Sequence, residues 1–436
     1  MLSTAWAALG GQEPPEAAVR VEGPVPLPSP LPVAELAVGA VAAQLLAAQR
    51  LTHGDSGTVV LSGPHVAAAF RSERHYRRPG ADSGIGFAPL SRFHRAQDGW
   101  VRLHANYPHH ERALRRALGP DPVAAIADSS ATDVEDTVVA AGGVAAAVRT
   151  AEEWAAHPQG RTVAALPLLT LERTANVPAR KPPLRGLRVL DLTRVLAGPV
   201  ATRTLASHGA DVLRLDAPGL PEDLDTLLET GSGKRHLSLD LQTPTGRRRV
   251  EELLGEADVL VHGYRPGSLD RFGLSRPDVA QRHPHLVVAT VSAWGSSGPW
   301  SRRRGFDSIV QAASGIADAL AGPDGAPGVL PAQALDHGSG HLLAAAVLTA
   351  VRAQRDGGTW YAELSLARLA HWLLTAPRTA QPPDEADQAD QTAEPPPLLR
   401  LETAAGPVEV VAPPGSPPWT RGLTEVDEAG GGWHPR

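Results

Sequence analysis

Short strand-like runs alternate with helix-like segments in the second half of the sequence, and this alternation constrains the fold more than any other feature. The strand-like runs are rich in Val and Leu and end at turns. Thr243 and Pro244 open one of the intervening helices, as an N-cap residue followed by Pro commonly does. This spacing predicts a parallel, doubly wound α/β sheet. The expected strands are residues 187–192, 211–215, 237–241, 258–262 and 286–292.

The chain has 436 residues, which is sufficient for two or three domains. A Pro-rich joint at residues 174–184 separates two parts of different character. We expect a flexible N-terminal arm (1–30), which could include one short helix, a smaller α+β domain (31–180), a large Rossmann-like domain (183–375), a disordered acidic loop (376–397) and a short β-like tail (398–436).

One internal repeat is visible. Residues 35–58 align without gaps on residues 336–359, with five identities in 24 positions. Both copies are predicted to be a helix followed by Gly-Thr and a strand. Glu35 therefore occupies in the first copy the place that Asp336 occupies in the second.

Composition excludes several classes of protein. The net charge of −6 disfavours a general binder of nucleic acid or of anionic membranes. The absence of Cys removes disulfides, thiolate metal sites and a cysteine nucleophile, and it is compatible with the cytoplasm. The N-terminus lacks the basic start of a signal peptide, and the longest apolar run, residues 342–351, is too short to span a bilayer. We therefore expect a cytoplasmic protein with no membrane partner.

Common cofactor and metal motifs are missing from the sequence. It contains no GxGxxG dinucleotide loop, no phosphate-binding P-loop and no GxSxG nucleophile elbow. His109 and His110 are adjacent, and His283 and His285 alternate, so neither pair has the spacing of a helical zinc motif. We expect surface histidines and no metal site.

Basic and aromatic residues cluster at the predicted strand ends. Lys234 is one of only two lysines, and it lies with Arg235 just before a strand. Tyr264, Arg265 and Arg271 follow the strand at 258–262, where parallel sheets bind ligands. Such a lining suits a phosphorylated adenine nucleotide, because Arg and Lys pair with phosphates and an aromatic ring stacks on a base. Arg194, in the first strand–helix turn, could hold an anion or could be solvated.

Asp336 lies at the start of a long apolar helix. At such a place Asp is an N-cap more often than a catalytic residue. As a catalytic residue, its carboxylate could act as a nucleophile in place of a cysteine. We expect the helix N-terminus to stabilise negative charge there and to keep the carboxylate ionised at neutral pH.

The sequence resembles the family III coenzyme A transferases of the CaiB/BaiF type. The resemblance lies in several runs that occur in the family's order: residues 183–216, 231–247, 257–274, 305–315 and the segment around Asp336. It implies a CoA transferase that moves coenzyme A from an acyl-CoA to a small carboxylic acid, with CoA as a substrate and no tightly bound cofactor. Members of the family form dimers, so the resemblance also implies that this chain forms a homodimer.

The resemblance implies roles for individual residues. Asp336 matches the catalytic aspartate, which forms an acyl-aspartyl anhydride and then an aspartyl-CoA thioester. The implied CoA contacts are Arg194, Lys234, Tyr264 and Arg271, with Arg235 and Arg265 beside them. A Gly-rich loop excludes water in the family, and Gly80, Gly84 and Gly86 could form it here, or they could belong to an ordinary surface turn.

The order of the two halves departs from the family. Residues 31–175 resemble the family's second half and residues 183–375 its first half. The sequence therefore predicts a circular permutation or a partly lost duplication, which is tolerated when the original termini are close. Whether such a chain forms the family's interlocked dimer is left open.

Two other functions are compatible with the sequence. The family's α-methylacyl-CoA racemases use a histidine where this chain has Phe306, and Phe cannot move a proton, so racemisation is disfavoured. A non-catalytic CoA-binding homologue is favoured by Gly263, which stands where the family has Asn, and by the lack of a second Gly loop. The retained Asp336 and Lys234 disfavour that alternative.

Overall fold

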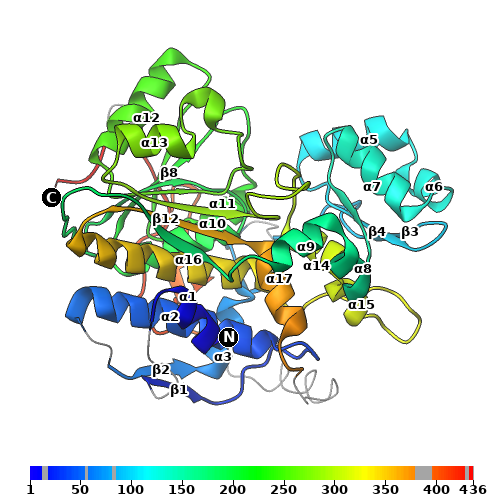
Figure 1. Cartoon of the computed structure of the whole chain (residues 1–436), viewed down its shortest axis with the longest axis horizontal. Helices are drawn as coiled ribbons and strands as arrows, with labels where there is room; N and C mark the ends of the chain where they lie inside the picture. The colour runs from blue at the N-terminus through cyan, green and yellow to red at the C-terminus, as the bar shows by residue number, and fades with distance from the viewer. Residues whose placement is uncertain (12–17, 55–56, 81–84, 379–394, 428–431, 436) are drawn as a thin grey trace.

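The structure is a computed structural model, and it describes residues 1–11, 18–54, 57–80, 85–378, 395–427 and 432–435. Within these residues the centre of the molecule is an eight-stranded sheet (Figure 1). Its strands are β6 (Thr170–Ala175), β7 (Arg188–Leu192), β8 (Asp211–Asp216), β9 (Arg235–Ser238), β10 (Val259–His262), β11 (Val287–Ser292), β12 (Thr359–Ser365) and β15 (Thr424–Glu425). The strand order is β15-β9-β8-β7-β10-β11-β12-β6, and all neighbours are parallel except β12 and β6.

Helices cover both faces of this sheet, which confirms the predicted doubly wound arrangement. Val189 of β7 packs in the core on one face, with α10 (Ala197–Ser207) and α16 (Ala334–Ala353). Its neighbour Leu190 packs on the other face, with α12 (Pro244–Glu256) and α13 (Arg276–Arg282). Strands buried on both faces need continuous apolar runs, and that is the pattern in the sequence. Strand β9 begins two residues earlier than predicted and ends at Ser238.

The described residues among the first 80 form a layer beneath the sheet (Figure 1). Its elements are α1 (Leu2–Ala8), β1 (Val19–Glu22), α2 (Val33–His53), β2 (Val59–Ser62), α3 (Gly63–Ala69) and α4 (Ser72–His75). Residues 1–30 differ from the flexible arm that we expected. Trp6 is buried, with the Arg50 guanidinium 4.3 Å from its ring, and β1 pairs in parallel with β2. Burial of this aromatic ring and strand pairing with a distant segment order the arm.

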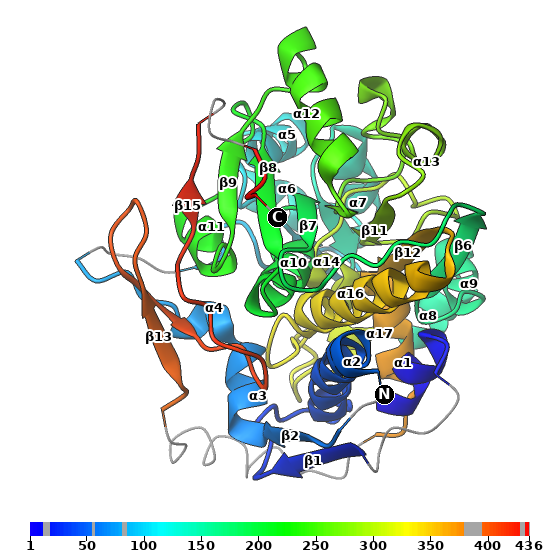
Figure 2. The same ribbon diagram turned by 90° about the vertical axis from the view of Figure 1, so that its left-hand side faces the viewer.

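Helices α2 and α16 lie side by side, as both views show (Figures 1 and 2). The two copies of the sequence repeat also begin with the same helix geometry. Glu35 and Asp336 are each the third residue of their helix, and the N-cap residues Pro32 and Gln333 have nearly the same backbone angles, φ −75°, ψ 60° and φ −73°, ψ 62°. Each helix is followed by a strand. The permutation itself stays a prediction.

Residues 93–147 form a separate three-stranded sheet with helices, which we call the small lobe (Figure 1, right). Its elements are β3 (Phe93–Arg95), β4 (Trp100–Leu103), α5 (Pro108–Leu118), α6 (Pro122–Ala127), α7 (Ala131–Ala140) and β5 (Ala145–Ala147). It has its own core, which includes Val101, Leu114 and Val138. Helix α5 ends at Gly119, which has a φ of 83°. Strand β6, from the segment assigned to the smaller domain, instead extends the large sheet.

The remaining elements connect these parts. They are α8 (Ala151–Ala156), α9 (Pro158–Ala164), α11 (Leu224–Thr230), η2 (Asp270–Phe272), α14 (Asp307–Ser314), α15 (Ile316–Ala319), η3 (Gln354–Asp356), α17 (Leu366–Thr375), β13 (Leu398–Leu401) and β14 (Val408–Val411). Strands β13 and β14 form an antiparallel pair in the predicted β-like tail. Most of the loop predicted to be disordered, residues 379–394, lies outside the described residues. Among the helices described, none is long and apolar enough to cross a membrane.

Candidate functional site

A cavity of about 450 Å³ opens at the carboxyl edge of the parallel strands, where the sheet meets the small lobe. The segments that follow β7 to β12 contribute its floor, and the start of α5 contributes its roof. The strand order reverses between β7 and β10, and ligands of doubly wound sheets bind at such a point. Lining residues from the strand ends are Leu192, Ala217, Leu241, Gly263, Ser292 and Leu366.

The turn between β7 and α10 forms one wall of the cavity. Val195 in this turn has a φ of 70°, and among the described residues it is the one non-glycine with a positive φ. A β-branched side chain rarely adopts this conformation, which occurs mainly at functional sites. Ala197 and Gly198 follow as the first turn of α10, whose N-cap Leu196 makes no side-chain cap. Backbone N–H groups of a first helical turn are suitable donors to an anion.

Asp336 lies at the floor of this cavity and is 6% exposed. It is not the N-cap of α16, because that position is Gln333. The side chain of Asp307 performs the capping, and its Oδ2 accepts from the N–H groups of Leu335 and Asp336 at 2.9 and 3.0 Å. The capping alternative for Asp336 is therefore wrong. In the described part of the chain, no hydrogen-bond donor reaches the Asp336 carboxyl.

The electrostatics of Asp336 differ from our expectation. Burial raises its pKa well above the ordinary value, and the carboxyls of Asp307 and Glu73 raise it further. Burial likewise raises the pKa of Asp307. The helix N-terminus does not offset these effects, because Asp307 already accepts the N–H groups of Leu335 and Asp336. The neutral form of Asp336 is favoured over a wider pH range than for an ordinary Asp.

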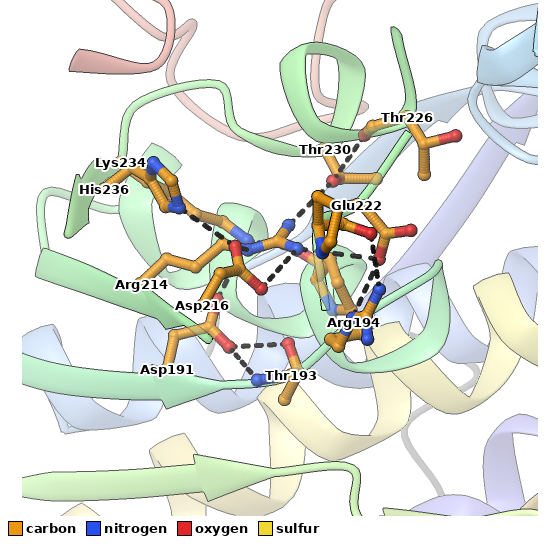
Figure 3. Close-up of polar contacts among 12 residues, drawn as sticks. Asp191, Thr193, Arg194, Arg214, Asp216, Glu222, Thr226, Thr230, Lys234 and His236 are labelled. Carbon is orange, nitrogen blue, oxygen red and sulfur yellow. Dashed lines mark hydrogen bonds and ion pairs between the residues drawn. The ribbon is translucent and has the colours of Figure 1, made fainter. Parts of the chain in front are cut away.

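Two of the predicted CoA contacts lie elsewhere. Lys234 is fully buried beneath α10, and its Nζ donates to Asp191 Oδ2 at 3.1 Å, Thr202 Oγ1 at 2.6 Å and the Pro199 carbonyl at 3.0 Å (Figure 3). Burial lowers its pKa to about 8, although Asp191 opposes this shift. Arg235 pairs with Asp211 at the opposite, amino-terminal ends of β9 and β8. Neither residue lines the cavity, because each basic group is held by a buried carboxylate.

Arg194, Tyr264, Arg265 and Arg271 do line the cavity, as predicted. Arg194 is paired with Glu222, whose carboxylate is 3.5 Å from its Nε. Arg265 and Arg271 form no ion pair with a described carboxylate, so their charges remain available to a ligand.

Arg304 is a cavity residue that the sequence analysis did not identify. It donates to the Gly142 carbonyl of the small lobe, and like Arg265 it pairs with no described carboxylate. Burial, followed by the charge of Arg304, lowers the pKa of Arg265. The cavity wall therefore carries positive charge that is not neutralised.

The small lobe contributes residues that the sequence analysis also missed. His109 and His110 line the cavity; His109 is half-buried, but His110 is 4% exposed, so the prediction of surface histidines is wrong for His110. Burial, followed by the charge of His109, lowers the pKa of His110 to about 2, so this imidazole is neutral. Phe306 stacks on His104 with ring centroids 3.6 Å apart, beside Tyr107. No sequence motif marks these residues, because their place at the cavity depends on how the small lobe docks on the large sheet.

The predicted glycine loop does not reach the cavity in the described residues. Gly84 lies outside them, and Gly80 and Gly86 are not among the lining residues. A Cβ at Gly80 or Gly86 would have no neighbour within 4 Å, so no close packing requires these glycines. Gly80 has a φ of 82°, which is compatible with a turn.

Comparisons with known proteins identify the family. The family model described as CoA-transferase family III matches residues 184–401, which is half of the chain. The chain belongs to this family. A probable fatty acyl-CoA transferase of Mycobacterium tuberculosis is 35% identical over 189 residues, which are 40% of this chain and 48% of that protein. The mouse (Mus musculus) succinyl-CoA:glutarate CoA-transferase is 35% identical over 185 residues, which are 40% of this chain and 42% of the mouse protein.

A formyl-CoA:oxalate CoA-transferase from Bradyrhizobium diazoefficiens is 34% identical over 187 residues, which are 40% of this chain and 44% of that protein. The chain thus spans less than half the length of each of these curated relatives. A crystal structure of the Mycobacterium tuberculosis protein aligns with a TM-score of 0.42 and 32% identity, over 52% of this chain and 62% of that one.

Proposed function

We propose that this family III chain is a CoA transferase that moves coenzyme A from an acyl-CoA to a carboxylic acid, with Asp336 as the nucleophile. The observation that carries the proposal is the position of Asp336. Its buried carboxyl lies at the floor of a cavity whose walls carry Arg265, Arg271 and Arg304. CoA supplies the phosphates that such arginines bind, and its thioester must then be brought to Asp336.

In the first half of the proposed reaction, the Asp336 carboxylate attacks the thioester carbonyl and expels CoA thiolate. The product is an acyl-aspartyl anhydride. The thiolate then attacks the aspartyl carbonyl, so the carboxylate of the donor acid leaves and Asp336 becomes an aspartyl-CoA thioester. In the second half the acceptor carboxylate repeats these two steps in reverse order, which regenerates Asp336 and releases the new acyl-CoA.

Charged groups around the cavity support these steps. The first turn of α10, at Ala197 and Gly198, presents N–H donors of the kind that stabilise a tetrahedral oxyanion. The arginines neutralise the phosphates, and Tyr264 offers an aromatic face to the adenine. Lys234 is assigned a structural role beneath α10 in place of a direct contact with CoA.

The racemase alternative needs an acid and a base on opposite faces of the substrate's α-carbon. Phe306 supplies neither, and the neutral His110 has too low a pKa to be an effective base at neutral pH. We expect a 2-methylacyl-CoA in D₂O to keep its α-proton. Rapid deuterium incorporation at that carbon would favour the racemase.

A non-catalytic CoA-binding protein is the second candidate, and the raised pKa of Asp336 favours it, because a neutral carboxyl is a poor nucleophile. The deciding experiment is a mass measurement of the protein after incubation with a panel of acyl-CoAs. We expect a covalent CoA adduct on Asp336, its absence in Asp336→Ala, and its retention in Glu35→Ala. Glu35 is a suitable control, because it is exposed and has the same position in α2. CoA binding without an adduct at any pH would favour the non-catalytic protein.

A further inference from the structure

Glu222, in the loop that follows β8, joins parts of the molecule that are distant in sequence (Figure 3). Its side chain is only 1% exposed. Its Oε2 accepts from the N–H of Val195 at 2.9 Å and lies 3.5 Å from Arg194 Nε. Glu222 therefore contacts two neighbouring residues of the β7–α10 turn. Arg214, beneath the turn, lies 3.7 Å from the same oxygen.

The other oxygen of Glu222 reaches the small lobe. Tyr107, at the N-cap of α5, donates its hydroxyl to Glu222 Oε1 at 2.5 Å. The Arg194 guanidinium lies 5.2 Å from the Tyr107 ring. Burial and then the charge of Glu222 raise the pKa of Tyr107, so the phenol keeps its proton and remains a donor. One buried carboxylate thus connects the small lobe to the cavity wall.

The contacted turn is the part of the wall that needs support. Val195 has a φ of 70°, and a β-branched residue stays in that region only where its surroundings hold it. The Val195 N–H donates to Glu222, and Arg194 is fixed by Glu222, by the Pro221 carbonyl and by the ring of Tyr107. Loss of Glu222 would free both the strained backbone and the guanidinium.

We propose that Tyr107 and Glu222 are positioning residues that fix the β7–α10 turn and hold the small lobe against it, which keeps water out of the cavity during transfer. This inference rests on the proposed transferase function. Water competes with both covalent intermediates. Its oxygen bonds to the acyl carbon of the anhydride, the bond to Asp336 breaks, and the donor acid, the Asp336 carboxylate and protons are released. Attack on the aspartyl-CoA thioester likewise returns Asp336 and free CoA thiol.

The first test compares hydrolysis of acyl-CoA with transfer to an acceptor acid. We expect Tyr107→Phe to raise the ratio of hydrolysis to transfer by about tenfold or more, because the variant lacks one hydrogen bond to a charged group. Tyr76→Phe is a matched control, since the Tyr76 hydroxyl donates to Asp225 at 3.0 Å away from the cavity lining. An unchanged ratio in Tyr107→Phe, or an equal rise in Tyr76→Phe, would overturn the proposal.

A second measurement does not depend on activity. Hydrogen exchange of the backbone amides at residues 193–198 and 104–110 should be faster in Glu222→Ala than in the unaltered protein. Glu222→Gln keeps one acceptor oxygen, which can accept from either Val195 or Tyr107 but no longer from both through separate oxygens, so its exchange should be slower than in Glu222→Ala and faster than in the unaltered protein. Should the unaltered protein neither transfer CoA nor form an adduct, the transferase function fails, and hydrogen exchange alone decides whether the pair holds the lobe. Unchanged exchange in Glu222→Ala would reject the positioning role.

Discussion

Asp336 must be ionised to act as a nucleophile, yet its surroundings favour the neutral form. Burial raises its pKa, and the nearest titrating groups are the carboxyls of Asp307 and Glu73. Glu73 also accepts from His337 Nε2 at 3.1 Å, and the hydrogen bond and charge of His337 lower the pKa of Glu73 against the effect of its burial. A negative charge thus persists behind Asp336. The carboxylate that does form is a stronger nucleophile because it is poorly stabilised.

The first prediction concerns the pH dependence of activity. The acid limb of kcat/KM should lie above the range of an ordinary Asp, because the free enzyme's Asp336 has a raised pKa. Asp307→Asn should move this limb to lower pH, since it removes a neighbouring charge while its amide oxygen can still cap α16. Asp318→Asn is the control: burial also raises the pKa of Asp318, but Asp318 does not line the cavity. An acid limb of kcat/KM that stays at the same pH in Asp307→Asn would contradict an effect of the Asp307 charge on the pKa of Asp336.

The second prediction concerns stability. The folded-state pKa of Asp336 exceeds its unfolded value, so ionisation of this group destabilises the fold as pH rises above the unfolded pKa. Asp336→Asn should therefore raise the melting temperature at neutral pH and have little effect at a pH of about 2.5, where Asp336 holds its proton in both the folded and the unfolded state because the unfolded pKa is about 3.9. Thermal denaturation at the two pH values measures this difference. Equal effects at both would show that ionisation is not the cause.

The third prediction separates two basic residues. Arg271→Ala should weaken CoA binding by about 1.5–3 kcal/mol, the range for a hydrogen bond to a charged group. Lys234→Ala should instead destabilise the fold by about 3–5 kcal/mol, because Asp191 loses its buried partner. Calorimetry and urea denaturation measure the two effects. A folded Lys234→Ala protein with normal stability and weak CoA binding would show that Lys234 contributes to CoA binding and not to the stability of the fold.

At the scale of elements, the helices and strands with strong periodicity could be predicted from the sequence. The β7 to β11 strands and α16 agree with the prediction, because continuous apolar runs and long apolar helices have few alternative structures. Strands β1 and β6 were missed. Both are polar at several positions and form through pairing with distant segments, which local sequence does not encode.

Some residues of the candidate site could likewise be predicted from the sequence, and others could not. Asp336, Arg265 and Arg271 could be predicted, because they follow recognisable strands or begin a long helix. The burial of Lys234 could not, since its partner Asp191 is 43 residues away in sequence. The roof formed by His109 and His110 could not be predicted either, because it depends on how the small lobe docks on the large sheet.

The fourth prediction concerns the contact between α10 and α16. A Cβ at Gly340 of α16 would lie 2.7 Å from the Ala197 carbonyl oxygen and 2.6 Å from Val200 Cγ1. Gly340→Ala should cost about 1–3 kcal/mol of stability and weaken CoA binding, because it displaces the first turn of α10 at the cavity. Gly255→Ala in α12 has open space and should stabilise the protein by about 0.5–1 kcal/mol. Denaturation and calorimetry of both variants test the close approach.

At the scale of the whole molecule, segments that are far apart in the sequence line the same cavity. His109 and Tyr107 precede the residues that match the family model, whereas Asp336 and Arg271 lie within them. The prediction of a homodimer is therefore tested separately from the proposal that these segments of one chain form the site.

The fifth prediction follows from this arrangement. Specific activity should stay constant when the protein is diluted, because the small lobe and the large sheet of one chain both contribute residues to the cavity. Activity and light scattering measured over the same dilution series test this expectation. Activity that falls together with the apparent mass would show that a second copy contributes to the site.

The two outer strands of the large sheet come from segments beyond the residues that match the family model. Strand β6 covers β12 on one side, and β15 covers β9 on the other (Figure 2). Residues 184–401 alone would lack both coverings and would present open rows of N–H and C=O groups along β12 and β9. Open sheet edges pair with those of other molecules, so this excised core should aggregate. The segments that flank the family match therefore prevent self-association by covering the sheet edges, in addition to supporting the site.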